Sequence, residues 1–205
     1  MNLENYFCCY PNVLTEKFCN DVIKYGNMQN LNTGITGSKQ LNELTEKELK
    51  NIKKIRKSDV SFFNDAWIFK EIKPWIDKAN MDAGWNFNID YAENFQFTKY
   101  ALNQFYDWHC DSYSKPYINH ENKNFNNKTR KISVSCILSK PEDYEGGDLE
   151  FNFKNTKRNM DLYKLEKLKQ GSLVIFPSFV WHRVKPVTSG TRYSLVIWNL
   201  GPSFI

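Results

Sequence analysis

Hydrophobic positions in the first third of the chain recur at helical spacing. The segment TEKFCNDVIKYG predicts a helix that is capped by Thr15 and ends at Gly26. The charged segment TEKELKNIKKIRK predicts a second helix, over residues 45–57, and a third is predicted over residues 64–84. Pro74 lies inside the third pattern, so we expect it to kink or restart that helix.

From Trp85 onward the hydrophobic period changes to two, which is typical of strands. The alternating segments, each bounded by Gly, Pro or polar turns, are WNFNID, ENFQFTKY, RKISVSCILS, GGDLEFNF, GSLVIFP and TRYSLVIWNL. Many short strands without long helices between them favour an antiparallel sandwich or barrel of the jelly-roll kind. We therefore expect an α+β protein that is mainly β, with a helical region over residues 1–84 packing on a β core over residues 85–205 as one integrated domain.

Two inserts interrupt the β pattern. Residues 112–129 are polar and rich in Asn and Lys, and residues 154–170 are basic and predict a short helix. Long loops at barrel mouths often bind ligands, so the insert 112–129 is a candidate substrate lid, with a disordered excursion as the alternative interpretation.

Composition narrows the class of protein. The chain has 205 residues, of which 41% are hydrophobic and 16% aromatic, as in a globular protein of one domain. A net charge of +5 without a clustered basic stripe does not indicate nucleic-acid binding. Five cysteines without CxxC spacing argue against a disulfide framework and a zinc–thiolate site. We find no signal-peptide pattern and no apolar run near the roughly 20 residues of a membrane helix, and we therefore expect a soluble, cytoplasmic protein.

The stretch FYDWHCDSY places His109 two residues before Asp111. On an extended segment both side chains point to the same face and Cys110 points away. A solvated loop or a His–Asp hydrogen bond is the simple interpretation, and a metal site requires a third ligand. His120 lies in the polar insert and is expected to be solvated, whereas His182 follows an apolar strand, where an imidazole needs a partner. Two imidazoles and one carboxylate form the facial triad of non-haem Fe(II) oxygenases, which leaves about three metal positions open.

A basic residue follows on the last predicted strand, TRYSLVIWNL. Strand parity puts Arg192, Ser194, Val196 and Trp198 on one face. A guanidinium among apolar strands needs an anion, and its planar shape matches a carboxylate. A dicarboxylate that chelates iron at one end and binds Arg192 at the other would meet this need, with a further hydrogen bond from Ser194. An ordinary surface or ion-paired arginine is the alternative.

The motifs HCD, YEGGDLEF, GSLVIFPSFVWHRVKPV and GTRYSLVIW follow one another in the chain. In this order and at these spacings, the sequence resembles the 2-oxoglutarate- and Fe(II)-dependent dioxygenase superfamily. Within that superfamily it is similar to the prolyl 4-hydroxylase-like branch, including bacterial and phage-borne members. The resemblance runs from about Ile55 to Gly201.

This resemblance implies a double-stranded β-helix core of the jelly-roll or cupin-like kind. It implies Fe(II) held by His109, Asp111 and His182, with 2-oxoglutarate and O2 as cosubstrates and ascorbate as a candidate reductant. The residues that it places beside the 2-oxoglutarate are Arg192, Ser194, Tyr100 and Trp198, although a core role for Trp198 is a comparable interpretation.

Three positions distinguish this chain from particular groups within the superfamily. Some relatives carry a cosubstrate-binding tyrosine in the strand that corresponds to RKISVSCILS, and this strand has none. Halogenases of the superfamily replace the metal-binding carboxylate with a small residue, so Asp111 favours hydroxylation. Nucleic-acid demethylases carry a second arginine where this chain has Trp198, which argues against nucleic-acid repair.

Three functions therefore compete. The favoured one is hydroxylation of a peptidyl residue, most naturally proline. The second is the same chemistry on a free amino acid or another small molecule. The third is a non-catalytic or zinc-binding jelly roll, against which Arg192 and Ser194 argue, because a zinc hydrolase needs no buried anchor for a dicarboxylate.

Overall fold

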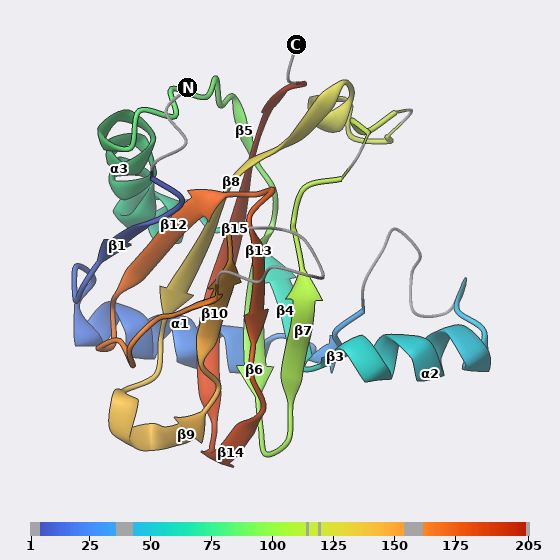
Figure 1. Ribbon diagram of the computed structural model, residues 1–205, viewed down its shortest axis with the longest axis vertical. Helices are drawn as coiled ribbons and strands as arrows, with labels where there is room; N and C mark the ends of the chain where they lie inside the picture. The colour runs from blue at the N-terminus through green and yellow to red at the C-terminus, as the bar shows by residue number, and fades with distance from the viewer. Residues whose placement is uncertain (1–4, 36–42, 114, 119, 154–161, 204–205) are drawn as a thin grey trace.

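The computed structural model describes residues 5–35, 43–113, 115–118, 120–153 and 162–203. Two antiparallel sheets face each other in a double-stranded β-helix (Figure 1). The larger sheet has the order β1-β12-β8-β15-β6-β4-β2, and β5 adds to β15. Its strands are β1 (Cys8–Tyr10), β12 (Leu173–Pro177), β8 (Lys128–Ile137), β15 (Arg192–Pro202), β6 (Phe95–Tyr100), β4 (Asp59–Phe63), β2 (Asn32–Thr33) and β5 (Tyr91–Ala92).

The smaller sheet has the order β11-β10-β13-β7-β3, and β9 and β14 form a separate ribbon. The strands of these two units are β11 (Leu162–Lys164), β10 (Leu149–Asn152), β13 (Trp181–Val184), β7 (Phe105–His109), β3 (Arg56–Lys57), β9 (Tyr144–Gly146) and β14 (Val187–Gly190). The expected mainly β fold with a jelly-roll core is confirmed.

Helix α1 (Glu16–Met28) begins at the predicted cap Thr15, and α2 (Glu46–Ile55) lies within the predicted range 45–57. The Thr15 hydroxyl accepts a hydrogen bond from the Phe18 amide at 3.1 Å, and Thr45 forms a capping box with Glu48. Helix α1 continues two residues past the expected end. Two short 3-10 helices, η2 (Lys123–Phe125) and η3 (Pro141–Asp143), lie in loops.

Helix α3 (Ala66–Asp82) runs through Pro74 without restarting, so of the two expected outcomes, a kink or a restart, the restart does not occur. Ile72 and Ile76, one turn apart on either side of this proline, are both buried. Pro74 itself faces outward. The buried stripe therefore holds the helix together across the missing backbone hydrogen bond.

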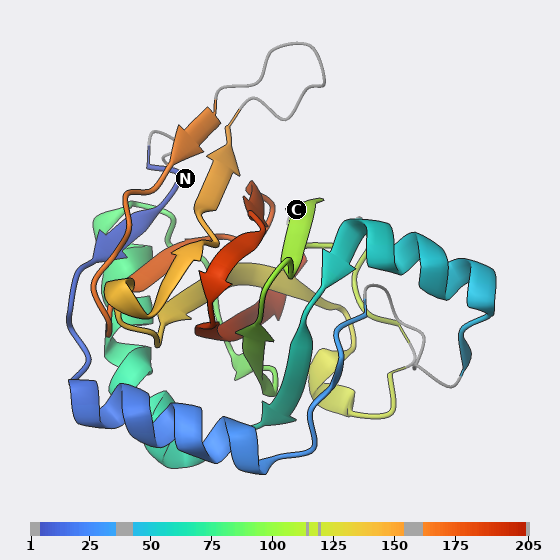
Figure 2. The ribbon, with the colours of Figure 1, turned by 90° about the horizontal axis from the view of Figure 1, so that it is seen from below.

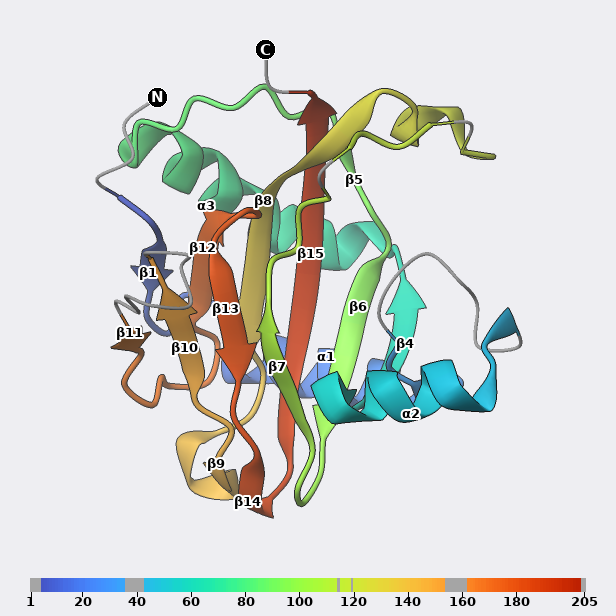
Figure 3. The ribbon, with the colours of Figure 1, turned by 45° about the vertical axis from the view of Figure 1, so that its right-hand side comes forward.

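The helices α1 and α3 cover the outer face of the larger sheet, and the smaller sheet covers the inner face (Figures 2 and 3). The predicted parity of β15 is confirmed, because Leu195 and Ile197 join the core beneath the helices, while Arg192 and Trp198 face the space between the sheets. This second face carries the candidate chemistry.

Residues 85–90 are not a strand, contrary to expectation. Asn86 adopts a φ of 50°, which breaks an extended conformation. Trp85 is nevertheless almost fully buried, and its indole nitrogen donates to the Asn5 carbonyl at 2.7 Å. The alternating hydrophobic residues here anchor a loop to the core.

The division into a helical region over residues 1–84 and a β core over residues 85–205 stays a prediction. The first region is not only helical, since β1 pairs with β12 and β4 pairs with β6. The predicted helix over residues 154–170 is also wrong where it can be described: residues 162–164 form β11 and residues 165–170 are irregular, while residues 154–161 lie outside the described residues. No helix in the described part of the chain is long and apolar enough to cross a membrane.

Candidate metal centre

The structure brings His109, Asp111 and His182 together between the two sheets. His109 ends β7 and lies directly opposite His182 on β13. The Asp111 oxygens lie 3.7 Å from the Nε2 atom of each histidine. One donor atom from each of the three residues falls within 4.8 Å of the others, and this is the only such group among the described residues. His120, as expected, is exposed, and its ring stacks on Phe125.

Backbone carbonyls orient both imidazoles. His109 Nδ1 lies 2.7 Å from the Asp107 carbonyl, and His182 Nδ1 lies 3.0 Å from the Val180 carbonyl. A carbonyl only accepts, so each Nδ1 carries the proton and donates. In the neutral ring each Nε2 then keeps its lone pair and can bind a cation, an arrangement common for metal-binding histidines.

Burial and charge shift the pKa values of His109 and Asp111. Burial, together with the neighbouring His182, lowers the pKa of His109 to about 3. Burial acts to raise the pKa of Asp111, but His182, His109 and Arg130 outweigh it and hold this pKa below its usual value. The group thus offers a neutral imidazole and a carboxylate in one place.

The donor chemistry fits Fe(II). Two imidazole nitrogens and a carboxylate oxygen match the facial triad of non-haem iron enzymes. Cys110 does not join the group, and its thiol donates to the Ser112 carbonyl at 3.5 Å.

A narrow inner cavity of about 30 Å³ extends from the metal group to Arg192. Arg192 is only 1% exposed and donates through Nη1 to the Ser194 hydroxyl at 3.2 Å. Tyr100 is its cross-strand neighbour on β6, with its ring centroid 5.5 Å from the guanidinium carbon. A bound dicarboxylate must widen this cavity by moving side chains.

A wider outer cavity of about 710 Å³ opens on the other side of His109 and Asp111. Trp198 lines both cavities. The insert 112–129 forms one wall of the outer cavity, although residues 114 and 119 lie outside the described residues. The aromatic side chains that line this cavity are Phe62, Tyr91, Tyr106, Tyr113, Tyr117, Phe125 and Trp198.

In the described part of the chain, three buried side-chain donors have no hydrogen-bond partner: Arg56 Nη2, Arg192 Nε and Trp198 Nε1. All three residues line one or both of these cavities. Buried donors are normally paired, so unpaired ones concentrated around two cavities indicate a site built for a ligand.

Arg56 was missed by the sequence analysis. It is 3% exposed, and its guanidinium lies 4.5 Å from the Tyr106 ring centroid. Tyr106 in turn stacks on His109 with centroids 3.4 Å apart. A charged residue at the end of a lysine-rich helix reads as exposed in the sequence, so no local pattern could have identified it.

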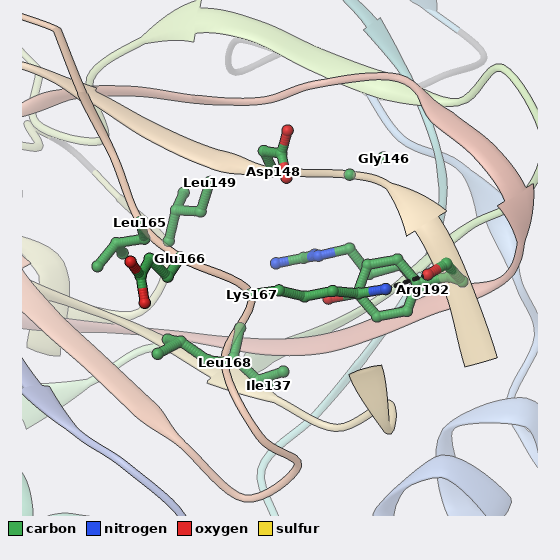
Figure 4. Close-up of a pocket in the computed structure, with 11 residues that line it drawn as sticks. Ile137, Gly146, Asp148, Leu149, Leu165, Glu166, Lys167, Leu168 and Arg192 are labelled. Atoms are coloured by element: carbon green, nitrogen blue, oxygen red, sulfur yellow. Dashed lines mark hydrogen bonds between the residues drawn. The ribbon is translucent and has the colours of Figure 1, made fainter. Parts of the chain in front are cut away.

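A third cavity lies behind Arg192, where Lys167 and Ile137 also contribute to the lining (Figure 4). The Lys167 ammonium donates to the Tyr144 carbonyl. Gly147 has a φ of 63°, and a Cβ atom there would lie 2.9 Å from Arg192 Cδ. The second glycine of YEGGDLEF therefore turns the chain before β10 and also leaves room for the Arg192 stem.

Comparison with known proteins identifies the family. The sequence model described as the 2OG-Fe(II) oxygenase superfamily matches residues 95–199. A PKHD-type hydroxylase of Synechococcus sp. (strain JA-2-3B'a(2-13)) is 42% identical over 67 residues, which cover 33% of this chain and only 27% of that relative.

Two solved structures share the fold over nearly their whole length. A viral collagen prolyl hydroxylase from Paramecium Bursaria Chlorella virus-1 has a TM-score of 0.65 at 17% identity, covering 97% of each chain. A Pseudomonas putida prolyl-4-hydroxylase has a TM-score of 0.67 at 16% identity, covering 96% of this chain and 93% of that one. The superfamily match spans more than half of the chain and contains the His109, Asp111 and His182 group, and the chain therefore belongs to the 2OG-Fe(II) oxygenase superfamily.

Proposed function

We propose that this protein is an Fe(II)- and 2-oxoglutarate-dependent dioxygenase that hydroxylates a peptidyl residue, most naturally proline. The observation that carries this proposal is the position of the metal group. It lies where a cavity containing a buried arginine, which pairs with no carboxylate of the described residues, meets a larger aromatic cavity. The metal ligands, the candidate anion site at Arg192 and the cavity that would hold the substrate therefore lie next to each other.

In this proposal His109, Asp111 and His182 hold Fe(II) through two nitrogens and one oxygen. Bound Fe(II), 2-oxoglutarate and O2 supply the oxidation: the cosubstrate becomes succinate and CO2, and a substrate C–H becomes C–OH. The protein holds the donors in place and surrounds them with apolar side chains. Phe176 packs edge-on against His182 with centroids 4.7 Å apart.

Arg192 binds the distal carboxylate of the 2-oxoglutarate in this proposal, and Ser194 and Tyr100 border the same place. The guanidinium is buried, and no carboxylate among the described residues pairs with it. A buried arginine without an anion is costly, which supports an anionic ligand. Trp198 lies between this site and the outer cavity.

The outer cavity supports a peptide as the substrate. Its volume of about 710 Å³ exceeds the needs of a single small amino acid and falls within the usual range for ligand sites. Aromatic grooves suit proline-rich segments, whose extended helix docks on flat rings. The two structural neighbours are named as a collagen prolyl hydroxylase and a prolyl-4-hydroxylase, which is in line with this substrate class.

The same chemistry on a free amino acid or another small molecule is the second candidate. It is favoured only if the insert 112–129 closes over the outer cavity and reduces its volume. A zinc-binding or non-catalytic jelly roll would use the same three ligands. Arg192, buried without a carboxylate partner among the described residues, argues against it, because such a protein has no dicarboxylate to bind.

Anaerobic addition of Fe(II) and 2-oxoglutarate tests the site through the visible charge-transfer absorption of the chelate. We expect the band in the wild type and in the control His120→Ala, and its loss in Asp111→Ala and His182→Ala. A band that survives in the last two variants contradicts the ligand assignment.

Substrate class is tested by aerobic incubation with proline-containing peptides and with free proline, with ascorbate present as a reductant. Mass spectrometry then detects the gain of one oxygen atom. Oxygen on the peptide supports the proposal, and oxygen on free proline alone supports the small-molecule alternative.

A further inference from the structure

A buried ion pair lies at the base of the outer cavity. Arg130 on β8 binds Glu93 through two contacts of 2.6 Å, one from Nε and one from Nη2. The two side chains are 11% and 10% exposed. Such a fork-to-carboxylate pair fixes the orientation of the guanidinium plane.

The pair makes further contacts with the backbone at Asp111, with Trp198 and with the insert. Arg130 Nη1 donates to the backbone carbonyl of Asp111 at 3.3 Å. The guanidinium carbon lies 3.8 Å from the Trp198 ring centroid, so the two groups stack. The Tyr117 hydroxyl, which belongs to the insert, donates to Glu93 Oε1 at 3.2 Å.

We propose that Arg130 is a positioning residue that couples the insert 112–129 to the metal ligand Asp111 and to Trp198. We call the chain Tyr117–Glu93–Arg130 the brace. The inference rests on the proposed function, since it assigns the metal to Asp111 and the substrate wall to the insert. A substrate that moves the insert would shift the brace and so alter the hydrogen bond from Arg130 to the Asp111 carbonyl. The Asp111 carboxylate would then change its position at the metal.

The charge of Arg130 alone does not explain these contacts. A lysine keeps the positive charge, but it cannot form the two-point pair, the stack on Trp198 and the bond to the Asp111 carbonyl at the same time. Arg130→Lys therefore separates positioning from simple charge compensation.

A second arginine–glutamate pair provides a matched control. Arg183 follows His182 in the sequence, binds Glu150 at 2.7 Å through Nε and Nη2, and lies 4.6 Å from the Trp108 ring centroid. Like Arg130, it pairs with a glutamate and lies over a tryptophan ring, but its side chain is 29% exposed and also lies 3.8 Å from Asp107. It lines neither cavity beside the metal group. Arg183→Lys thus perturbs a similar ion pair without the proposed coupling.

The experiment measures Co(II) binding to the metal-free full chain, by affinity and by the visible d–d spectrum, which reports ligand geometry. Neither readout needs 2-oxoglutarate, substrate or turnover. We expect Arg130→Lys to weaken Co(II) binding about tenfold, as is typical when a group that orients a metal ligand is lost, and to change the spectrum. Arg183→Lys should keep wild-type affinity and spectrum.

Thermal unfolding of both variants controls for a general loss of stability. Wild-type Co(II) affinity and an unchanged spectrum in Arg130→Lys would overturn the proposal. Equal weakening in Arg130→Lys and Arg183→Lys would also overturn it, because the effect would then follow from losing any arginine–glutamate pair of this kind.

The link to the insert is tested by Tyr117→Phe, which removes only the hydroxyl that binds Glu93. We expect a smaller loss of Co(II) affinity, about two- to fivefold, in line with one hydrogen bond. In the Arg130→Lys background the same change should have no further effect, since both act through one path. The control Tyr163→Phe, at an exposed position of β11 that lines neither cavity, should have no effect in either background. Fully additive losses would overturn the coupling.

These outcomes are distinct from failure of the proposed function. A protein that shows the Co(II) effects but hydroxylates neither peptides nor amino acids contradicts the proposed function and leaves the brace in place. A protein that hydroxylates peptides normally but lacks the Co(II) effects contradicts the brace alone.

Discussion

His109 and His182 form a cross-strand pair on β7 and β13, with their ring centroids 4.2 Å apart. Neighbouring strands in one sheet thus bring two distant parts of the chain to a single point. Asp111 completes the group just after β7 ends, where its amide donates to the Ser178 carbonyl at 2.9 Å. The rigidity of the smaller sheet, and not a flexible loop, therefore sets the distance between the two imidazoles.

Replacement of Arg192 by methionine should separate cosubstrate binding from metal binding. Loss of a hydrogen-bonded charge contact of about 1.5–3 kcal/mol should raise the Kd for 2-oxoglutarate roughly ten- to a hundredfold. Metal affinity should remain unchanged, because Arg192 does not belong to the ligand group. Titration of the charge-transfer band measures the first quantity and Co(II) binding the second. An equal loss of both would contradict the assigned role.

Gly147→Ala should weaken 2-oxoglutarate binding through Arg192. The added Cβ would approach Arg192 Cδ to 2.9 Å and would strain a backbone φ of 63°. We expect a several-fold higher Kd for 2-oxoglutarate, measured by the same band. Gly171→Ala is the control, because it also adds strain at a positive φ, but its Cβ would meet the Leu14 backbone. If Gly147→Ala and Gly171→Ala bind 2-oxoglutarate with the same Kd, the contact between residue 147 and Arg192 does not affect cosubstrate binding.

The metal-free protein should lose stability in mild acid because of His109. The folded pKa of about 3 lies below the ordinary value of 6.5, so between these values the unfolded state binds the additional proton. The contribution of His109 is therefore fully present above pH 6.5 and decreases as the pH falls. The limiting slope for one group is about 1.4 kcal/mol per pH unit. The pKa of Asp111 is also lowered, so the stability that this carboxylate contributes is lost only below about pH 3.8.

Urea unfolding of the metal-free protein at pH 7 and pH 5 measures this effect, with His109→Gln as the comparison. The variant should lose less stability than the wild type between the two values. Parallel losses in the two proteins would assign the acid sensitivity to other groups.

Gly26→Ala should destabilise the protein, although alanine is the better helix former. The added Cβ would lie 2.4 Å from the Phe97 ring, where α1 rests on the larger sheet. Overpacking costs about 1–3 kcal/mol, which outweighs a helix-propensity gain of up to about 1 kcal/mol. Chemical unfolding measures the difference. Lys24→Ala, at an exposed position of the same helix, should be neutral or slightly stabilising. A Gly26→Ala variant that is more stable than the wild type would contradict the prediction and show that the Phe97 ring moves aside.

Local rules in the sequence were sufficient for several elements. Thr15 and Thr45 each begin a helix because a side-chain oxygen satisfies a free backbone amide. The alternation of side chains along β15 follows from the strand period. It correctly placed Arg192 on the face opposite to Leu195 and Ile197, which pack in the core beneath the helices. These features depend on neighbours within a few residues, so the sequence alone reveals them.

Other elements were mispredicted because long-range contacts outweigh local pattern. Residues 85–90 alternate like a strand, but the positive φ of Asn86 makes them a loop. The strand β4 follows a helix almost directly and is stabilised by its pairing with β6, which no local period reveals. Pro74 was expected to kink or restart α3, and the helix does not restart there, with buried residues one turn apart on either side of the proline.

The sequence by itself determined which residue types were available for the chemistry and in what order: HxD, a later histidine, and an arginine two residues before a serine. Only the tertiary structure decided that His182 faces His109, that Arg56 and Arg130 are buried beside them, and that the insert reaches Glu93. The physical reason is that the desolvation of a charge depends on what surrounds it in space. Arginines on a basic helix or beside a polar insert look solvated in the sequence, and they become part of a site only when the two sheets close over them.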